Sequence, residues 1–358
     1  MEKVLVTGAS GYIGLHVIAQ LIDRGYLVRG SLRSRDRESE VRNALSKVVN
    51  TENKLEICEL DLLKDEGWDD AAQGCEYVIH VASPLVQKAP DDENEVIEPA
   101  KQGLIRALKS AIKNKVKRFV MTSSFSAVGY GHDRDVFDES HWTDPKKNIG
   151  AYNKSKAIAE RAMWDHLESL PESDRIEAVA INPTLVVGPS LSDDMGTSNM
   201  FIQKMLEGSY RAAPKIHFGF VTVEDTARAH IEAMLNPNAS GKRFILSEKN
   251  MWLREMNQVL VDNGYTKAPL KQLPDFLIKF LTSFNPKLLI NMKPNTINTN
   301  TAFAGSNLGV IALAGVAGLA AAGALSNAYS QEKARKSRIK GLRDLSKVTE
   351  SEKELATV

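Results

Sequence analysis

Residues 3–14 read KVLVTGASGYIG, and this stretch decides the fold. Its first residues, Lys3–Thr7, form a short run with the β-branched content typical of a strand. From residue 12 to residue 21, apolar side chains recur at the spacing of a helix. A glycine-rich turn lies between the two patterns. A strand, such a turn and a helix in this order predict the first unit of a βαβ fold.

The glycines of the turn are spaced G-x-x-G-x-x-G, at Gly8, Gly11 and Gly14. The first allows a tight turn out of the strand, the second lets the backbone approach a pyrophosphate, and the third lets the helix pack close to the sheet. Free N–H groups at the helix start attract anionic phosphates. Incidental glycines in a turn are the alternative, but they would not require all three positions. We expect a dinucleotide to be bound here by Thr7, Gly8, Ser10, Gly11, Tyr12, Ile13 and Gly14.

Strand and helix patterns continue to alternate up to about residue 180. The strand patterns lie at residues 26–32, 54–58, 77–80, 119–122 and 178–181, and the helical ones at 36–49, 93–113 and 153–169. Strands that alternate with helices need right-handed crossovers, which give a parallel sheet covered on both faces. The sequence therefore predicts a doubly wound α/β (Rossmann) fold.

The alternation ends after residue 182, which suggests a division of the chain. We expect a dinucleotide-binding domain at residues 1–182, a smaller substrate-binding lobe at 183–295, and a tail at 296–358. Residues 189–218 of the lobe are rich in Ser, Asp, Gly and Pro, as in loops that cover a cleft. Val223–Leu235 predicts a helix with Thr222 as its N-cap, and we expect this helix to pack back on the first domain.

The tail differs from the rest of the chain because residues 308–325 are uncharged and rich in Gly and Ala, with Lys and Arg following from residue 333. This length reaches the lower bound for a spanning helix, but Ala and Gly contribute little transfer energy. Two interpretations stay open: a buried or disordered low-complexity segment, and a membrane anchor through residues 304–325. A single span that kept the basic residues in the cytosol would place the folded domain on the far side, away from cytosolic cofactor.

The composition narrows the function classes. The 358 residues contain 46 Lys and Arg and 45 Asp and Glu, a net charge of +1 that excludes a general nucleic-acid binder. The two cysteines, Cys58 and Cys75, have no metal-type spacing and cannot form a disulfide framework, so we expect no metal and a reducing compartment. A strand that begins at residue 3 leaves no room for a secretory signal, and we therefore expect a cytoplasmic protein.

The tip of the second predicted strand distinguishes NADP from NAD. Enzymes that bind NAD place an acidic residue there for the ribose hydroxyls, whereas this strand ends in Arg33. A guanidinium can form two parallel hydrogen bonds to a 2′-phosphate, which a carboxylate would repel. We therefore expect NADP(H), and the alternative is that Arg33 is a solvated surface charge. Further cofactor contacts are expected after the third and fourth strands, from Asp61, Leu62, Val81, Ala82 and Ser83.

Tyr152 and Lys156 are four residues apart in a helical pattern, so they lie on one face of the expected helix. A phenol titrates near pH 10, and a neighbouring ammonium stabilises the phenolate, so we expect Lys156 to lower the pKa of Tyr152. Ser123 and Ser124 follow the fifth strand pattern, at the carboxyl edge where such sheets bind ligands. A hydroxyl there can donate to a substrate carbonyl, although a serine pair after a strand is by itself more typical of a cap or turn.

Together these motifs resemble the extended short-chain dehydrogenase/reductase superfamily. The motifs are TGASGYIG, HVASP, FVMTSSFSAV, YNKSKAIAE, INPTLVVGP and FVTVEDTARAHI, and they cover about the first 290 residues. Within it the chain is most similar to the plant dihydroflavonol 4-reductase and cinnamoyl-CoA reductase group and to yeast-type NADPH aldehyde and ketone reductases. The resemblance implies that Tyr152 is the general acid, Lys156 its electrostatic partner and Ser124 the residue that orients the carbonyl. It further implies that Pro183, Thr184 and Val186 flank the nicotinamide.

The resemblance implies a function and leaves rivals open. The expected function is NADPH-dependent reduction of a small-molecule aldehyde or ketone, with Phe125 narrowing the substrate pocket. The alternatives are a nucleotide-sugar epimerase with bound NAD, a sterol-type dehydrogenase, and a catalytically silent NADP-binding module. The helix at 93–113 and the helix of Tyr152 are expected to form a homodimer face, by analogy with many members of the superfamily.

Overall fold

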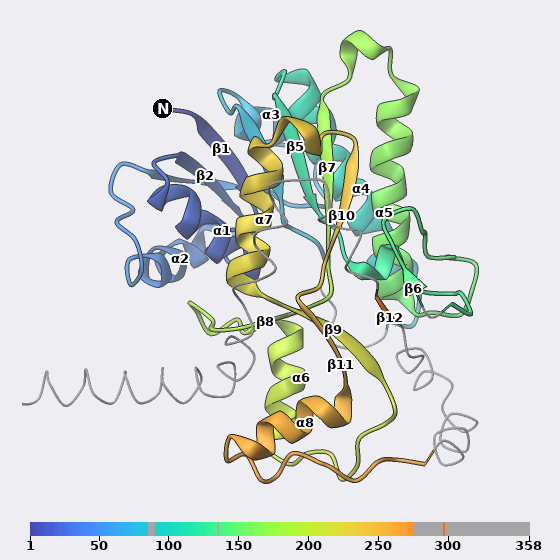
Figure 1. Cartoon of the computed structure of the whole chain (residues 1–358). Helices are drawn as coiled ribbons and strands as arrows, with labels where there is room; N and C mark the ends of the chain where they lie inside the picture. Colours follow the sequence, from blue (N-terminus) through green and yellow to red (C-terminus); the bar gives the residue numbers. More distant parts are fainter. Residues whose placement is uncertain (85–89, 135, 275–295, 298–358) are drawn as a thin grey trace, which may run out of the picture.

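The computed structural model describes residues 1–84, 90–134, 136–274 and 296–297 (Figure 1). In this part of the chain the main sheet has seven strands in the order β3-β2-β1-β4-β5-β7-β10, and every neighbouring pair is parallel. The strands are β1 (Lys3–Thr7), β2 (Leu27–Leu32), β3 (Leu55–Glu59), β4 (Tyr77–His80), β5 (Arg118–Thr122), β7 (Glu177–Pro183) and β10 (Lys242–Leu246). The predicted doubly wound α/β fold is confirmed.

Two layers of helices cover the sheet, because successive side chains of a buried strand point to opposite faces. On β1, Val4 and Val6 join the apolar cluster on one face, while Leu5 joins the cluster on the other. The first cluster contains α1 (Tyr12–Asp23), α2 (Glu38–Leu45) and α7 (Val223–Leu235). The second contains α3 (Trp68–Ala72), α4 (Asn94–Lys113) and α5 (Ala151–Ser169).

Helix α7 confirms two details of the sequence analysis. Thr222 is its N-cap, and the side-chain oxygen accepts a hydrogen bond from the Asp225 N–H at 3.1 Å. The helix also packs against α1, as expected. Short 3₁₀ turns complete the helical elements: η1 (Arg35–Arg37), η2 (Phe125–Ala127), η3 (Glu172–Asp174) and η4 (Pro237–Ala239).

The order of the strands places a crevice beside β1. The chain runs from β1 to β2 and β3 on one side, and then returns to β4 on the other side of β1. Connections leave in opposite directions at such a switch point, so a crevice forms at the carboxyl ends of the two strands, where these folds bind ligands. The turns after β1 and β4 touch, because a Cβ on Gly8 would lie 3.0 Å from the Ala82 Cα.

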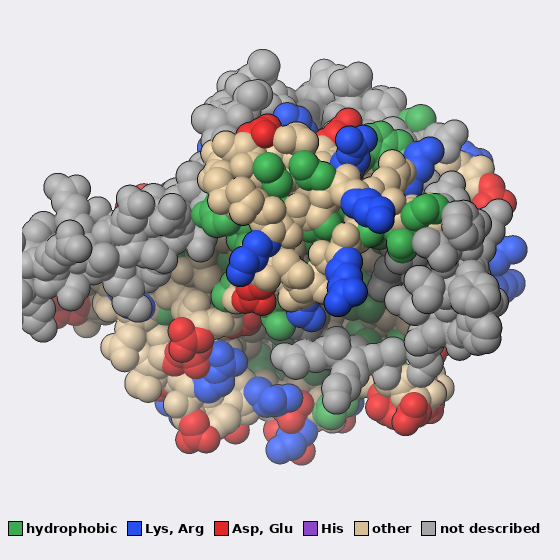
Figure 2. Space-filling view, turned by 90° about the horizontal axis from the view of Figure 1, so that it is seen from below, with side chains coloured by type: hydrophobic (Ala, Val, Ile, Leu, Met, Phe, Trp, Pro, Cys, Tyr) green, Lys and Arg blue, Asp and Glu red, His purple; other side chains and the backbone are tan. Residues whose placement is uncertain are grey.

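A smaller unit lies below the main sheet in Figure 1. Its three-stranded sheet has the order β11-β9-β8 and packs with two helices around Phe220, Met251 and Leu253. The elements are β8 (Leu185–Val187), β9 (His217–Thr222), β11 (Lys249–Trp252), α6 (Gly196–Leu206) and α8 (Leu253–Asp262), and a short parallel pair joins β6 (Val136–Phe137) to β12 (Thr296–Ile297). Figure 2 shows this end of the molecule, with Lys and Arg side chains interspersed among hydrophobic ones.

Strand β10 belongs to the main sheet although it comes from residues that we assigned to the smaller lobe. The division of the chain into domains therefore stays a prediction.

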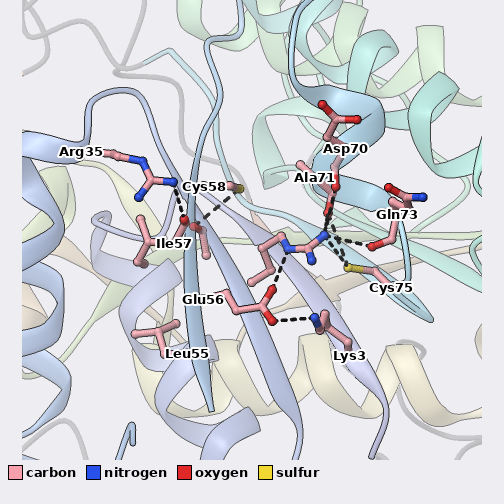
Figure 3. Close-up of polar contacts among 12 residues, drawn as sticks. Lys3, Arg35, Leu55, Glu56, Ile57, Cys58, Asp70, Ala71, Gln73 and Cys75 are labelled. Atoms are coloured by element: carbon pink, nitrogen blue, oxygen red, sulfur yellow. Dashed lines mark hydrogen bonds and ion pairs between the residues drawn. The ribbon is translucent and has the colours of Figure 1, made fainter. Parts of the chain in front are cut away.

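Arg29 on β2 links α3 to the edge strand of the main sheet, and Figure 3 labels its partners Glu56, Asp70, Ala71 and Gln73. The Arg29 Nη1 atom donates to three carbonyl oxygens at the C-terminal end of α3, those of Asp70 at 3.0 Å, Ala71 at 2.8 Å and Gln73 at 2.9 Å. A cation is favourable at this end of a helix because the last carbonyls carry partial negative charge. The Arg29 Nε atom donates to Glu56 on β3 at 2.9 Å, so one side chain links three elements.

The predicted tail and membrane anchor lie almost wholly outside the described residues. This applies to residues 304–325 and to the basic residues that follow them. Among the residues that are described, no helix combines the length and apolar character needed to cross a membrane. The two interpretations of the tail stay predictions.

Candidate active site

The turn between β1 and α1 has the close packing that its glycines predict. Gly8 has a φ of +71°, which favours glycine, and a Cβ on Gly14 would lie 2.3 Å from the Gly8 carbonyl oxygen. Helix α1 has Gly11 as its N-cap, with no side-chain cap and no acidic residue in the first turn. The N-cap side chain therefore accepts no hydrogen bond from the backbone N–H groups at this end, and these groups are available to an anionic ligand.

The other predicted residues of this turn have defined partners. The Thr7 hydroxyl accepts a hydrogen bond from the Ala82 N–H at 3.1 Å and lies 3.0 Å from His80 Nδ1. Ser10 accepts a hydrogen bond from Arg37, and the side chain of Ile13 is half-buried. The Tyr12 hydroxyl donates to the Gly188 carbonyl at 3.0 Å, and burial raises the pKa of this phenol well above its usual value. Because the Tyr12 hydroxyl is already hydrogen-bonded, we expect a ligand to contact this residue through its backbone.

Arg33 follows β2 and differs from the arginines next to it. Arg35 lies 3.7 Å from Glu38, and Arg37 forms a bidentate pair with Glu40 at 2.8 Å. Arg33 is exposed and has no hydrogen bond or ion pair with any residue that the structure describes. Its guanidinium is therefore available for a ligand anion at the tip of β2.

The residues expected after β3 and β4 lie at the same edge of the sheet. The Asp61 carboxylate accepts a hydrogen bond from the Leu63 N–H at 3.0 Å and so fixes its own turn. The Leu62 side chain packs against α4, where a Cβ on Gly103 would come within 2.5 Å of it. Val81, Ala82 and Ser83 follow β4 and are half-buried beside the glycine turn.

The residues expected beside the nicotinamide lie where β7 leads into β8. Pro183 ends β7 and is buried. The Thr184 hydroxyl donates to the Leu246 carbonyl at 2.9 Å, which ties the segment to β10. Val186 is 7% exposed and belongs to the apolar cluster around α1 and α7. Their contacts with a ligand stay a prediction.

Ser124 and Tyr152 are brought together from distant parts of the sequence. Ser124 follows β5, accepts a hydrogen bond from the Ser126 N–H at 3.1 Å, and interacts with the Tyr152 side chain. Tyr152 is in the first turn of α5, and the residue is 38% exposed. Burial raises the pKa of the Tyr152 phenol, although the interaction with Ser124 opposes the shift. Our expectation of a lowered pKa was wrong for this state, because desolvation of the phenolate outweighs the stabilising contacts.

Lys156 lies one turn further along α5, with its Nζ atom 6.0 Å from the centre of the Tyr152 ring. The residue is 6% exposed, and burial lowers the pKa of the ammonium to about 8, although the nearby Glu160 carboxylate opposes this shift. No hydrogen bond joins the ammonium to another residue in the described part of the chain. A buried ammonium without an acceptor costs free energy, so the position suits a ligand hydroxyl.

The sheet contributes a titratable group next to Lys156, which is His80 at the end of β4. Burial and the positive charge of Lys156 lower the pKa of His80 to about 3. Its imidazole is therefore neutral at physiological pH.

Sequence reasoning missed Glu160, Asn182 and Arg243, which form hydrogen bonds around the Ser124 turn. Glu160 is four residues after Lys156, so helical spacing could have found it. Arg243 is on β10, and no local sequence pattern marks it as a site residue. Phe125 is 7% exposed and packs against Phe137, with ring centres 5.9 Å apart, and its role in narrowing a substrate pocket stays a prediction.

These positions define a class of site. A hydroxyl pair and an ammonium lie at the carboxyl edge of a parallel sheet, on the side where a glycine turn and an uncapped helix N-terminus can take phosphates. Residues 4–246 match the model of the NAD dependent epimerase/dehydratase family. The chain therefore belongs to this family, within the extended short-chain dehydrogenase/reductase superfamily.

Individual relatives support the membership. A cinnamoyl-CoA reductase from Medicago truncatula is 36% identical over 281 residues, which are 76% of this chain and 82% of the relative. A dihydroflavonol 4-reductase from Arabidopsis thaliana is 35% identical over 268 residues, 72% of this chain and 69% of the relative. Among solved structures, the yeast methylglyoxal/isovaleraldehyde reductase complexed with NADPH has a TM-score of 0.67 and 25% identity, and covers 84% of this chain and 91% of its own.

Proposed function

We propose that this protein is an NADPH-dependent reductase that transfers a hydride to an aldehyde or ketone carbon while Tyr152 protonates the oxygen. One observation carries the proposal: the Ser124 hydroxyl lies near enough to the Tyr152 phenol to lower its pKa, and both side chains lie beside the buried Lys156 ammonium. A carbonyl oxygen that replaced this mutual contact would have two hydroxyl donors. The relatives whose names describe reductases of carbonyl compounds support the same reaction class.

The described residues fit NADPH at three points. The glycine turn leaves room for a pyrophosphate against an uncapped helix N-terminus. Within the described ranges the Arg33 guanidinium has no partner, so it suits a 2′-phosphate, whereas the neighbouring arginines are paired with carboxylates. The Lys156 ammonium has no acceptor among the same residues and suits a ribose hydroxyl. When bound, the nicotinamide would supply the hydride.

The protein residues supply orientation and a proton. Ser124 holds the carbonyl oxygen in place by a hydrogen bond, and Tyr152 donates its phenolic proton to that oxygen as it becomes an alkoxide. The raised pKa of Tyr152 does not prevent this step, because an alkoxide is a much stronger base than a phenolate. The Lys156 ammonium then stabilises the phenolate that remains on Tyr152.

The same residues also suit an epimerase that holds NAD and produces no net reduction. Arg33 at the tip of β2 favours the reductase, because an NAD site usually has an acidic residue there.

The test is NADPH oxidation by the purified protein with a panel of aliphatic, aromatic, flavonoid and steroid aldehydes and ketones, run in parallel with NADH. We expect turnover of at least one carbonyl class, and a preference for NADPH. Protein that purifies with tightly bound NAD and oxidises NADPH with no member of the panel would favour the epimerase.

A further inference from the structure

Glu160 is a fully buried carboxylate on α5, one helical turn beyond Lys156, with 0% exposure. Its Oε2 atom accepts hydrogen bonds from the Ser123 hydroxyl and from the Asn182 amide, the latter at 2.7 Å. Its Oε1 atom accepts from the Arg243 Nε. The donors come from β7, from β10 and from the turn after β5, so one carboxylate connects α5 to three neighbouring strands of the sheet. A buried charge is tolerated when it is paired and hydrogen-bonded in this way.

Arg243 is itself held on several sides. Its side chain is 8% exposed, and its Nη1 atom donates to the carbonyls of Glu139 at 2.9 Å and His141 at 2.6 Å. The guanidinium also lies 3.7 Å from the centre of the Trp142 ring, a cation–π contact. Because these contacts fix the arginine, the positive charge on the far side of Glu160 has a defined position.

Among the residues that the structure describes, Glu160 is the group near Lys156 that carries a negative charge. From β4, His80 faces the lysine and is neutral, with a pKa of about 3. Tyr152, on α5, carries its proton at neutral pH. The Tyr130 phenol interacts with Tyr152 and is also protonated, because its pKa is raised to about 12. The Glu160 carboxylate favours the protonated lysine and opposes the effect of burial.

Glu160 is also connected to the backbone of the proposed catalytic serine. The Asn182 Nδ2 atom donates both to Glu160 and to the Ser124 carbonyl at 3.1 Å. The Ser123 hydroxyl, adjacent in sequence, donates to the same carboxylate oxygen. The turn that presents the Ser124 hydroxyl is therefore anchored on both sides by groups that bind Glu160.

We propose that Glu160, paired with Arg243, is a positioning residue that supplies the counter-charge of the Lys156 ammonium and fixes the turn that carries Ser124. The inference rests on the proposed function, because it assigns Glu160 an effect on the proton-donating pair. Arg243 has a second effect: it compensates part of the carboxylate charge and so limits how strongly Glu160 favours the charged lysine. The pair thereby sets the pH range in which the ammonium persists.

The experiment measures kcat against pH for NADPH-dependent reduction by the wild type, Glu160→Gln, Glu160→Asp and the double variant Glu160→Gln/Arg243→Gln. We expect Glu160→Gln to move the alkaline limb of the profile down by about one pH unit, because an opposite charge is lost beside Lys156. Glu160→Asp keeps the charge and should keep the limb. The double variant removes both charges and should move the limb by less than the single variant.

The melting temperature and the Kd for NADPH of each variant separate an electrostatic effect from structural damage, because damage would change these quantities as well as the limb, and the two side chains are in contact, so their effects need not add. A Glu160→Gln protein that binds NADPH and melts near the wild-type temperature, with its limb unchanged, overturns the proposal. If the single variant does not fold, the double variant still provides a test, because neutral replacement of a buried pair is often tolerated. In the double variant, an alkaline limb that stays at the wild-type position overturns the proposal.

A second measurement does not depend on activity. Competitive acetylation of Lys156 at increasing pH, followed by mass spectrometry, gives the pKa of its amine directly. We expect a value near 8 in the wild type and a lower one in Glu160→Gln. The same pKa of the Lys156 amine in the wild type and in Glu160→Gln would overturn the proposal. Failure of the proposed function is distinct: it would appear as an absence of carbonyl reduction or as an active Tyr152→Phe protein.

Discussion

The Nζ atom of Lys156 lies 6.0 Å from the centre of the Tyr152 ring, on the same face of α5. No hydrogen bond between these two side chains is found in the described part of the chain. Ser124, which follows β5, interacts with the Tyr152 side chain, so a short helical motif and the end of a distant strand meet at one phenol. Burial has opposite effects on the two side chains: it raises the pKa of Tyr152 and so favours its proton, and it lowers the pKa of Lys156 and so disfavours its charge.

The first prediction concerns pH. Burial lowers the pKa of Lys156 to about 8, so the ammonium is present below this pH and is lost above it. Since the charged form stabilises the phenolate left on Tyr152, kcat for carbonyl reduction should be level below pH 8 and fall above it. In Lys156→Arg, whose guanidinium keeps its proton, the rate should be lower at all pH values and this fall should disappear. The same alkaline limb in Lys156→Arg would assign it to another group.

The second prediction concerns cofactor choice. Arg33→Ala removes the unpaired guanidinium at the tip of β2, and should raise the KM for NADPH by about 10- to 100-fold, while the KM for NADH stays nearly constant. Arg35→Ala is the matched control, because Arg35 is two residues away and lies 3.7 Å from Glu38. Equal losses for the two cofactors in Arg33→Ala would exclude a contact with the 2′-phosphate.

The third prediction separates two glycines of the turn. Gly11 has a φ of −80°, and an added Cβ would meet its nearest atom at 3.3 Å, so Gly11→Ala should fold with a small loss of stability. It should nevertheless weaken NADPH binding at least 10-fold, because the methyl group occupies the space for the pyrophosphate. Gly14→Ala would bring a Cβ to 2.3 Å from the Gly8 carbonyl oxygen and should destabilise the fold itself. Calorimetric melting and NADPH titration check the two variants, and full cofactor affinity in Gly11→Ala would refute the assignment.

The fourth prediction concerns stability in acid. His230 is fully buried, and its pKa is lowered to about 4. Its Nδ1 lies 2.7 Å from the Thr226 carbonyl and its Nε2 lies 2.7 Å from the Thr122 hydroxyl. Between pH 6.5 and 4 the unfolded chain binds a proton at this residue that the folded protein refuses, so stability falls as the pH falls, by about 3 kcal/mol at pH 4.

The measurement is the melting temperature as a function of pH for the wild type and His230→Gln. The glutamine amide can donate to Thr226 but does not titrate, so the variant should lose less stability between pH 6.5 and 4.5. Parallel curves for the two proteins would contradict the predicted proton linkage at His230.

Local patterns predicted the elements that build the crevice. The bounds of β1 and β4 agree with the sequence patterns, because buried parallel strands are short apolar runs and the glycines mark the turn between β1 and α1. Tyr152, Lys156 and Ser124 were found because helical spacing and the end of a strand are visible in sequence. The structure brings these three together, and their catalytic roles stay predictions.

Long-range contacts were not predictable in this way. Arg243 reaches Glu160 only because β10 pairs with β7, a neighbour far away in the sequence. Phe125 packs in a cluster with Phe137, and no local sequence pattern indicates this contact. The pKa of Tyr152 depends on how many protein atoms surround one hydroxyl, and only the folded structure gives that.

The central claim is that Tyr152 donates the proton during carbonyl reduction. The most direct test is a single turnover: protein saturated with NADPH is mixed with a carbonyl compound that the panel identifies, and oxidation of the cofactor is followed in the wild type and in Tyr152→Phe. We predict a rate at least 100-fold lower in Tyr152→Phe, with the Kd for NADPH within about twofold of the wild type. A Tyr152→Phe protein that reduces the carbonyl at the wild-type rate would contradict the claim.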